Sequence, residues 1–128
     1  MKTILVDAAD TFTVDGKIHQ ELYGLLETYP NKKIVVTNAN DEEQPKYGLV
    51  DLPYELFTLS HEPNKTDSDY FIKLFERFNL SADEVIYFEH SIDAVKSAES
   101  IGITSYYYDS DKRDLVALKK FLDENLNS

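Results

Sequence analysis

Cysteine is absent from the 128-residue sequence, so disulfide bonds, thiolate zinc sites and a cysteine nucleophile are excluded. Glycine and proline occur only four times each, which excludes collagen-like and low-complexity disordered chains. No apolar run approaches the ~18 residues of a membrane-spanning helix, and the short run before Asp7 cannot form the core of a signal peptide. The sequence therefore predicts a soluble, cytoplasmic protein.

Positive charge is also scarce, because 13 Lys and Arg stand against 24 Asp and Glu and give a formal net charge of −11. This excess of negative charge repels nucleic-acid phosphates and anionic lipid, so neither nucleic acid nor membrane is an expected partner. A small anion can still bind where local donors or a metal ion offset the field. The length favours a single domain over residues 1–128, and 42% of the residues are hydrophobic and available for its core.

Short apolar runs alternate with amphipathic stretches along the whole chain. Strands are expected at residues 4–6, 34–36, 56–59, 85–88 and 104–108. Helices are expected at residues 18–29, 41–49, 66–78, 92–101 and 115–126. The second of these helices is weakly patterned, whereas the third begins with Thr66 and Asp69 at the spacing of a capping box. The alternation predicts an α/β fold, a Rossmann-like three-layer sandwich with a mostly parallel sheet.

Polar residues of complementary chemistry come directly after the predicted strands. Asp7 ends the first strand, and Thr37 and Asn38 end the second. Glu89 ends the fourth strand, and Lys65 lies just before the helix that leads to it. Ligands of open parallel sheets bind outside the carboxyl ends of the strands, so these side chains are expected to meet. A carboxylate nucleophile, a hydroxyl, an ammonium group and a further acid indicate Mg²⁺-assisted phosphoryl transfer.

The order of these residues resembles the haloacid dehalogenase superfamily of phosphohydrolases over nearly the whole chain. The first motif of that family is a strand followed by Asp-x-Asp-x-Thr, and residues 4–11 (Ile-Leu-Val-Asp-Ala-Ala-Asp-Thr) are similar to it. The second motif, a strand ending in Thr or Ser, is matched by Thr37. The third is a Lys, often in Lys-Pro-x-Pro, and Lys65 matches it with both prolines replaced. The fourth, an acidic pair with a later acid, is similar to residues 87–95 (Tyr-Phe-Glu-His-Ser-Ile-Asp-Ala-Val).

The resemblance implies a catalytic role for three of these side chains. Asp7 matches the nucleophile that forms an aspartyl-phosphate, and Thr37 and Lys65 match the residues that hold the phosphoryl oxygens. Thr11 and Asn38 are secondary candidates for binding substrate or for holding the adjacent loops. The substrate would be a small phosphorylated molecule or a phosphoprotein.

The same resemblance implies Mg²⁺ as the cofactor. Its ligands would be Asp7, the backbone carbonyl of Ala9, and either Glu89 or Asp93, directly or through water. His90 occupies the second position of the acidic pair, and a neutral imidazole is a poor ligand for so hard a cation.

Two further departures from the family pattern affect the expected activity. Ala9 stands where the family has its general acid, a group typically worth ~10²–10⁴-fold in rate, so turnover is expected to be slow and restricted to good leaving groups. Only residues 8–17 separate Asp7 from the first predicted helix, and nothing after Thr37 is long enough for a cap domain. An open site without a cap suits a bulky substrate, or a partner subunit that acts as a lid.

Several alternatives follow from the same residues. A receiver domain has a related fold, but its acceptor Asp should follow the third strand, where this chain has Ser60. A catalytically impaired relative that serves as a binding or assembly module is the main alternative to a phosphohydrolase. A stable phosphoacceptor that resolves its Asp7 adduct slowly is a third. Homo-oligomerisation stays open.

Three histidines, an acidic run and three consecutive tyrosines have structural rather than catalytic interpretations. His61 and His90 are expected to be turn or surface histidines, His19 lies among polar residues and has no expected role, and residues 41–43 are expected to be a negatively charged helix start. Residues 106–108, three consecutive tyrosines, are expected to lie half-buried against a helix, with an association surface as the alternative.

Overall fold

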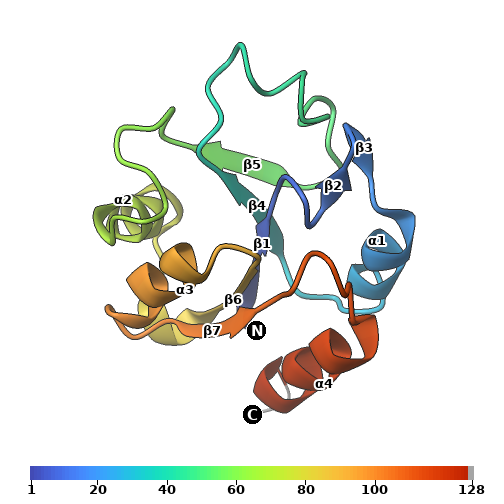
Figure 1. Ribbon diagram of the computed structural model, residues 1–128. Coiled ribbons are helices and arrows are strands. Elements are labelled where there is room, and N and C mark those ends of the chain that lie inside the picture. Colours follow the sequence, from blue (N-terminus) through green and yellow to red (C-terminus); the bar gives the residue numbers. More distant parts are fainter. Residues whose placement is uncertain (127–128) are drawn as a thin grey trace.

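The five apolar runs form one parallel sheet in a computed structural model that describes residues 1–126 (Figure 1). All neighbouring strands are parallel and follow the order β5-β4-β1-β6-β7. The strands are β1 (Thr3–Asp7), β4 (Lys33–Thr37), β5 (Glu55–Thr58), β6 (Val85–Glu89) and β7 (Thr104–Tyr107). The predicted α/β fold with a parallel sheet is confirmed.

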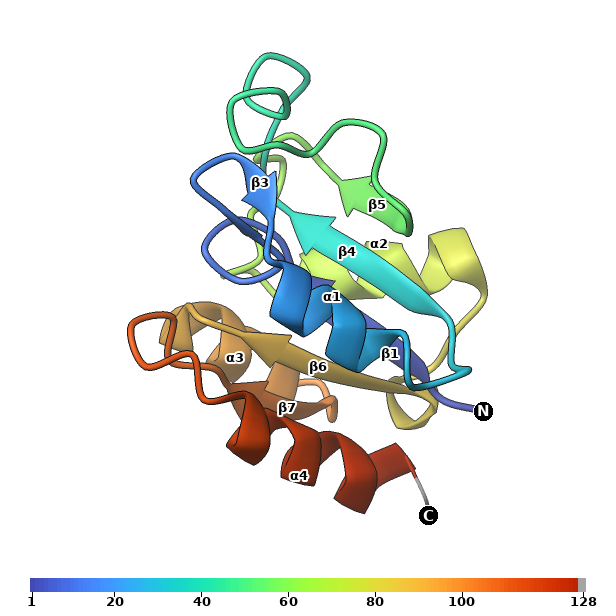
Figure 2. The same cartoon turned by 90° about the vertical axis from the view of Figure 1, so that its right-hand side faces the viewer.

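Helices cover both faces of this sheet and complete the three layers. Figure 2 shows α1 (Gln20–Leu26) and α4 (Leu115–Leu126) in front of the sheet, with α2 (Asp69–Phe78) and α3 (Ile92–Glu99) behind it. A short 3₁₀ turn (Ala82–Glu84) precedes β6. Within residues 1–126, none of the helices has the length and apolar content needed to cross a bilayer.

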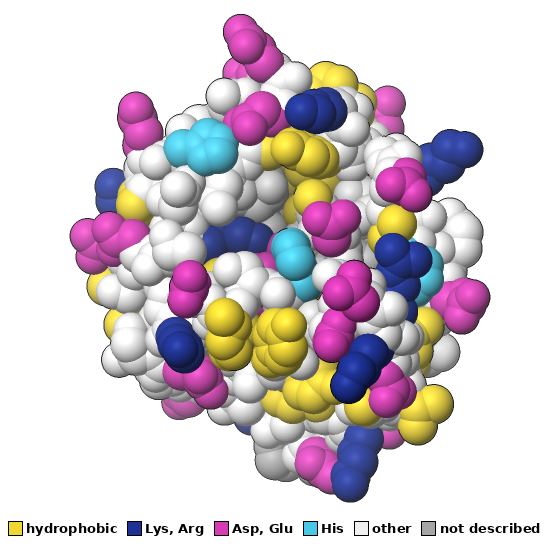
Figure 3. Space-filling model, viewed as in Figure 1, with side chains coloured by type: hydrophobic (Ala, Val, Ile, Leu, Met, Phe, Trp, Pro, Cys, Tyr) yellow, Lys and Arg dark blue, Asp and Glu magenta, His cyan; other side chains and the backbone are white. Residues whose placement is uncertain are grey.

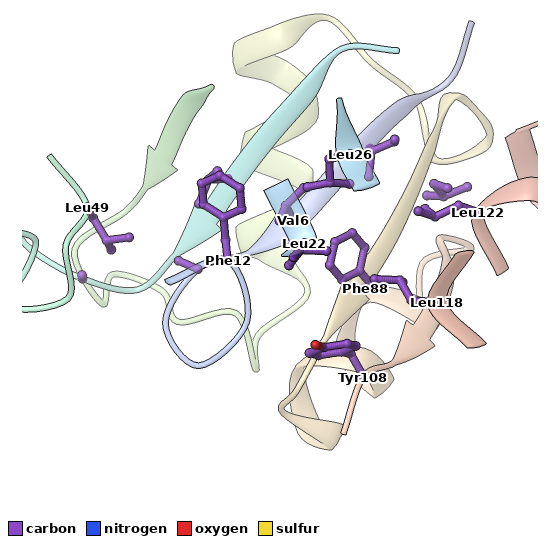
Figure 4. Packing of buried hydrophobic residues seen from close by; sticks show 14 residues of the cluster. Val6, Phe12, Leu22, Leu26, Leu49, Phe88, Tyr108, Leu118 and Leu122 are labelled. Carbon is purple, nitrogen blue, oxygen red and sulfur yellow. The ribbon is translucent and has the colours of Figure 1, made fainter. Parts of the chain in front are cut away.

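Residues of β1 alternate between the two hydrophobic layers, because successive side chains of a strand point to opposite faces. Val6 belongs to the layer that contains Leu22 of α1 and Leu118 of α4, and Figure 4 shows these side chains together. Leu5 belongs to the opposite layer, with Leu74 of α2. All five side chains are fully buried, and burial of each stabilises the fold by about 1.5–3 kcal/mol relative to exposure.

The strand order places the topological switch point between β1 and β6. From β1 the chain moves outward through β4 to β5, and α2 then returns it to β6 on the other side of β1. The carboxyl ends of β1 and β6 therefore lie side by side at the topological switch point. Asp7 is the last residue of β1 and Glu89 the last residue of β6.

Residues 41–49 do not form the predicted helix. Residues 41–48 are a series of turns, within a long connection between β4 and β5. Pro45 supplies no N–H to a helical ladder, and Gly48 adopts a φ of +73°, so the segment cannot continue as a helix. The expected helix start at residues 41–43 is wrong for the same reason.

Two helix starts also differ from expectation. Helix α1 begins at Gln20, because Ile18 belongs to a small antiparallel hairpin of β2 (Thr13–Val14) and β3 (Lys17–Ile18). The hairpin and residues 38–54 stand together at the carboxyl ends of the strands (Figure 2). Helix α2 begins at Asp69, its N-cap residue is Ser68 rather than Thr66, and Ser68 makes no side-chain capping bond. The Asp69 N–H donates to Asp67 Oδ1 at 2.9 Å. The capping box from Thr66 to Asp69 is therefore wrong.

The consecutive tyrosines behave largely as the structural interpretation predicts. Tyr106 stacks on Phe121 of α4 with ring centroids 5.1 Å apart, and Tyr108 is buried. Tyr107 is exposed at the edge of the sheet.

Candidate active site

Asp7 is a buried carboxylate with hydrogen bonds to both oxygens, and it is the last residue of β1, the central strand of the sheet. Its side chain is 1% exposed. Oδ1 accepts from Lys65 Nζ at 2.7 Å, and Oδ2 accepts from Thr11 Oγ1 at 2.7 Å. Oδ2 also accepts from the His90 N–H at 3.2 Å and pairs with His90 Nδ1. Thr11 and Lys65, both predicted site residues, are thus hydrogen-bonded to Asp7. His90 also contacts Asp7, although sequence analysis gave it no role in the site.

Opposing effects act on the pKa of Asp7. Burial disfavours the carboxylate, but the nearby Lys65 ammonium and the hydrogen bond from His90 outweigh it and hold the pKa of Asp7 well below its ordinary value. The same contacts raise the pKa of His90 to about 10, chiefly through its hydrogen bonds to Asp7 and Glu89. Asp7 is therefore an ionised carboxylate beside a protonated imidazole.

Lys65 links the two strands that form the switch point. Its Nζ donates to Asp7 Oδ1 and to Glu89 Oε1, both at 2.7 Å, and makes a longer bond to the Val36 carbonyl at 3.3 Å. Burial opposes the charge, but the two carboxylates outweigh it and raise the pKa of Lys65. The backbone N–H of Lys65 donates to Asn38 Oδ1 at 2.7 Å, which fixes the segment beside the end of β4. Asn38 thus positions Lys65.

Glu89 is fully buried, and each of its carboxylate oxygens is hydrogen-bonded. Oε1 accepts from Lys65 and from the Tyr87 hydroxyl, and Oε2 accepts from the Ser91 N–H at 3.0 Å. Asp93, the alternative acid, is exposed in the first turn of α3. The structure therefore places Glu89 beside Asp7 and leaves Asp93 at the surface.

Thr37 is held at the end of β4 by a tyrosine from α2. The Tyr70 hydroxyl accepts from the Thr37 N–H at 3.1 Å and lies 2.9 Å from both the Thr37 and Phe57 carbonyls. The Thr37 hydroxyl oxygen accepts from the Ala39 N–H at 3.1 Å. Tyr70 thereby fixes the ends of β4 and β5 relative to each other and orients Thr37.

Asp7, Thr37 and Lys65 line a cavity of about 220 Å³ at the carboxyl ends of the strands, and Glu89 lies buried behind Lys65. Figure 3 shows this face of the molecule, with a hollow that has a basic side chain at its floor and histidine at its border. The cavity brings together the predicted Asp7, Ala9, Thr37, Asn38 and Lys65, and it is also lined by Ala39, Glu43, Tyr47, His61 and His90. Sequence reasoning missed the second set, because most of it comes from loops without regular periodicity.

A second cavity of about 220 Å³ adjoins the first. Ala9 and Tyr47 line both cavities, and the hairpin and Lys46 complete the second one. A ligand bound at Asp7 therefore has space to extend toward the hairpin.

Asp7, Glu89 and His90 form the group within residues 1–126 with the donor atoms to hold a metal ion. One ligand atom from each lies within 4.8 Å of the others. Carboxylate oxygens suit a hard divalent cation, and the imidazole is the less suitable member of the set. Ala9 borders the same cavity, and Asp93 is outside the group.

The fold is that of the haloacid dehalogenase superfamily. It has the strand order, the three layers and the polar residues at the strand ends described above. The resemblance seen in the sequence is thus confirmed at the level of the fold. No protein-family model matches the sequence, and no curated protein matches it.

Among solved structures, an uncharacterised protein from Corynebacterium glutamicum is similar over 96% of both chains, with 18% identity and a TM-score of 0.66. A haloacid dehalogenase-family enzyme from Bacteroides thetaiotaomicron is 20% identical with a TM-score of 0.60, and the match covers 77% of this chain and 54% of that one. An aspartate-to-alanine mutant of a Bacteroides thetaiotaomicron enzyme with the same description, in complex with magnesium and inorganic phosphate, has a TM-score of 0.52 at 20% identity and covers 69% and 51%. The present chain thus spans about half the length of the two Bacteroides chains.

Proposed function

We propose that the chain is a Mg²⁺-dependent phosphohydrolase of the haloacid dehalogenase type that acts through an aspartyl-phosphate on Asp7. The observation that carries this proposal is the buried Asp7–Lys65–Glu89 arrangement at the switch point, which opens into a cavity that Thr37 also lines. An ionised carboxylate at the floor of a small polar cavity is suited to attack on phosphorus.

The chain's own residues account for binding of the phosphoryl group. The Lys65 ammonium has three protons, and its bond to the Val36 carbonyl is the longest at 3.3 Å. A phosphoryl oxygen can replace that carbonyl without disturbing the bonds to Asp7 and Glu89. Thr37 contributes its hydroxyl group from the end of β4, and these donors stabilise charge that develops on the phosphoryl oxygens.

The oxygen donors at the site fit Mg²⁺. Asp7, Glu89 and the Ala9 carbonyl would hold the ion, with Glu89 rather than the exposed Asp93 as the second acid. When bound, the ion would supply positive charge that offsets the repulsion of the Asp7 carboxylate and a phosphate dianion. The magnesium and phosphate in a structurally similar enzyme support this assignment.

The proposal is tested by phosphate release from p-nitrophenyl phosphate in the presence of Mg²⁺. We expect phosphate release by the wild type, because p-nitrophenolate leaves without a proton, and a loss to background in Asp7→Asn. Asp83→Asn is the matched control, since Asp83 is exposed at the opposite edge of the sheet, before β6. Equal rates in the wild type and Asp7→Asn would refute Asp7 as the nucleophile.

The alternative is a catalytically impaired protein that serves as a binding or assembly module. It is favoured by Ala9 and by the three donors that already occupy Asp7 Oδ2. Ala9→Asp distinguishes the two functions. An inert wild type that becomes active in this variant has an intact site and lacks only an acid, whereas inactivity of both proteins supports the binding module. A phosphoacceptor would instead retain a phosphoryl group on Asp7, which mass spectrometry detects.

A further inference from the structure

The wall of the cavity holds a histidine that the proposed function does not yet use. His61 lines the same cavity as Asp7 and Ala9, and both of its ring nitrogens have partners. Nδ1 lies 2.9 Å from Asn64 Oδ1, and Nε2 lies 2.6 Å from Glu43 Oε1. His61 thus provides a ring with a fixed orientation in a cavity whose usual acid is replaced by Ala9.

The backbone around His61 is held in an unusual conformation that directs it toward Glu43. Ser60 and His61 have φ values of 52° and 68°, in the left-handed region that non-glycine residues rarely adopt. The Ser60 N–H donates to Thr58 Oγ1 at 3.0 Å, and the Glu62 N–H donates to the Leu59 carbonyl at 3.0 Å. These bonds turn the chain sharply after β5.

Glu43 is anchored independently of His61. Its Oε1 accepts from the Asn40 N–H at 3.0 Å, and its own N–H donates to Asn40 Oδ1 at 3.0 Å. Hydrogen bonds from Glu43 and Asn64 raise the pKa of His61 above its ordinary value of 6.5. This shift favours the protonated ring, which is the form in which a histidine donates a proton.

We propose that His61, oriented and charged by Glu43, is the general acid and base that replaces the missing carboxyl group at Ala9. This inference rests on the proposed function and assigns a catalytic residue that the motifs of the sequence do not include. Its basis is the placement of the His61–Glu43 pair in the cavity that contains Asp7.

Both half-reactions balance with His61 in this role. In the first, an Asp7 oxygen bonds to phosphorus and the bond from phosphorus to the leaving oxygen breaks. The leaving oxygen takes the place of Asn64 Oδ1 at His61 Nδ1 and receives the Nδ1 proton of the imidazolium, while Nε2 keeps its bond to Glu43. In the second, neutral His61 takes a proton from water as the water oxygen bonds to phosphorus. The bond from phosphorus to Asp7 then breaks, its electron pair returns to the carboxylate, and inorganic phosphate is released with the imidazolium restored.

The dependence of rate on the leaving group tests this role. A p-nitrophenolate leaves without a proton, whereas the alkoxide from glycerol 2-phosphate requires one. For His61→Asn we expect kcat/KM for glycerol 2-phosphate to fall ~10²-fold or more. With p-nitrophenyl phosphate we expect a retained burst of p-nitrophenol, slow steady-state turnover and accumulation of phosphorylated Asp7. His19→Asn is the matched control, because His19 lies before α1 and does not line the cavity.

A second variant separates chemistry from a structural role. Ala9→Asp in the His61→Asn background restores turnover of both substrates if a general acid is all that is missing. Equal loss on both substrates without a burst or rescue, or no loss on either, overturns the role of His61 while the proposed function stands. A wild type that neither releases phosphate nor becomes phosphorylated on Asp7 overturns both proposals.

Discussion

Lys65 forms ion pairs with both buried carboxylates of the candidate site. Its ammonium lies 2.7 Å from two buried carboxylates that belong to different strands. Attraction in a buried site repays the cost of removing these groups from water only while all partners are present. The same side chain that is expected to bind phosphate therefore also contributes to the stability of the fold.

Replacement of this ammonium should destabilise the protein strongly. Lys65→Met leaves the buried carboxylates of Asp7 and Glu89 with His90 as their remaining cation, and we expect the free energy of unfolding to fall by about 3–5 kcal/mol. Lys73→Met on the exposed face of α2 should stay within about 0.5 kcal/mol of the wild type. Urea denaturation followed by circular dichroism measures both. Similar midpoints for the two variants would show that the buried ion pairs add nothing.

The His61–Glu43 pair should be visible in the titration of the imidazole. NMR of the ring protons should give a pKa for His61 above 6.5, and Glu43→Gln should lower it because the hydrogen bond to the carboxylate is lost. A pKa raised by folding adds stability below the unfolded value of 6.5, and this contribution disappears as the pH rises through the folded value. The effect on stability should be small, because both side chains are partly exposed. An unchanged pKa in Glu43→Gln would contradict the pairing.

The sequence predicts the site residues that end strands or match a motif, and misses His61 and Glu43, which come from loops. Asp7, Thr37 and Glu89 follow apolar runs, and a parallel sheet necessarily brings such ends to one edge. His61 and Glu43 are brought together by turns whose left-handed residues have no periodic signal. Ala9 was recognisable as a missing acid, but its replacement can be identified only in three dimensions.

At the scale of elements, the hairpin and the connection between β4 and β5 are in close backbone contact. A Cβ atom added to Gly48 would lie 2.2 Å from the Gly16 carbonyl oxygen, and Gly48 also has a φ of +73°. The Asp15-Gly16 pair, with φ values of 52° and 76°, forms the hairpin turn. The sequence analysis did not predict this hairpin, and the helical pattern of residues 41–49 misled because Pro45 and Gly48 interrupt it.

This contact predicts opposite effects for two glycine substitutions. Gly48→Ala should destabilise the protein by roughly 1–3 kcal/mol, because the methyl group meets backbone and the residue keeps a left-handed φ. Gly24→Ala in α1 meets nothing within 4 Å and should stabilise by about 0.5–1 kcal/mol. Thermal unfolding of the two variants provides the comparison. The contact is unimportant if Gly48→Ala unfolds at the wild-type temperature.

At the scale of the whole molecule, the net charge of −11 lies mostly on the surface and acts against the compact state. Salt screens such repulsion within a Debye length of about 10 Å at 0.1 M. We therefore expect the unfolding temperature to rise between roughly 0.02 and 0.2 M NaCl, because surface repulsion weakens while the buried Lys65 pairs are little screened. A lower unfolding temperature at the higher salt concentration would show that favourable surface pairs dominate.

The bonds of Lys65 and Tyr70 have a consequence for the exchange of parts between related proteins. Asn38 receives the backbone N–H of Lys65, and the Tyr70 hydroxyl bridges Thr37 and Phe57. Lys65 and Tyr70, the two ends of the segment of residues 65–70, thus fix its position relative to the end of β4 through their bonds to Asn38 and Thr37. A chimera that imports this segment should also import residues 37–38, because a donor lysine without its matching asparagine would enter the site in the wrong register.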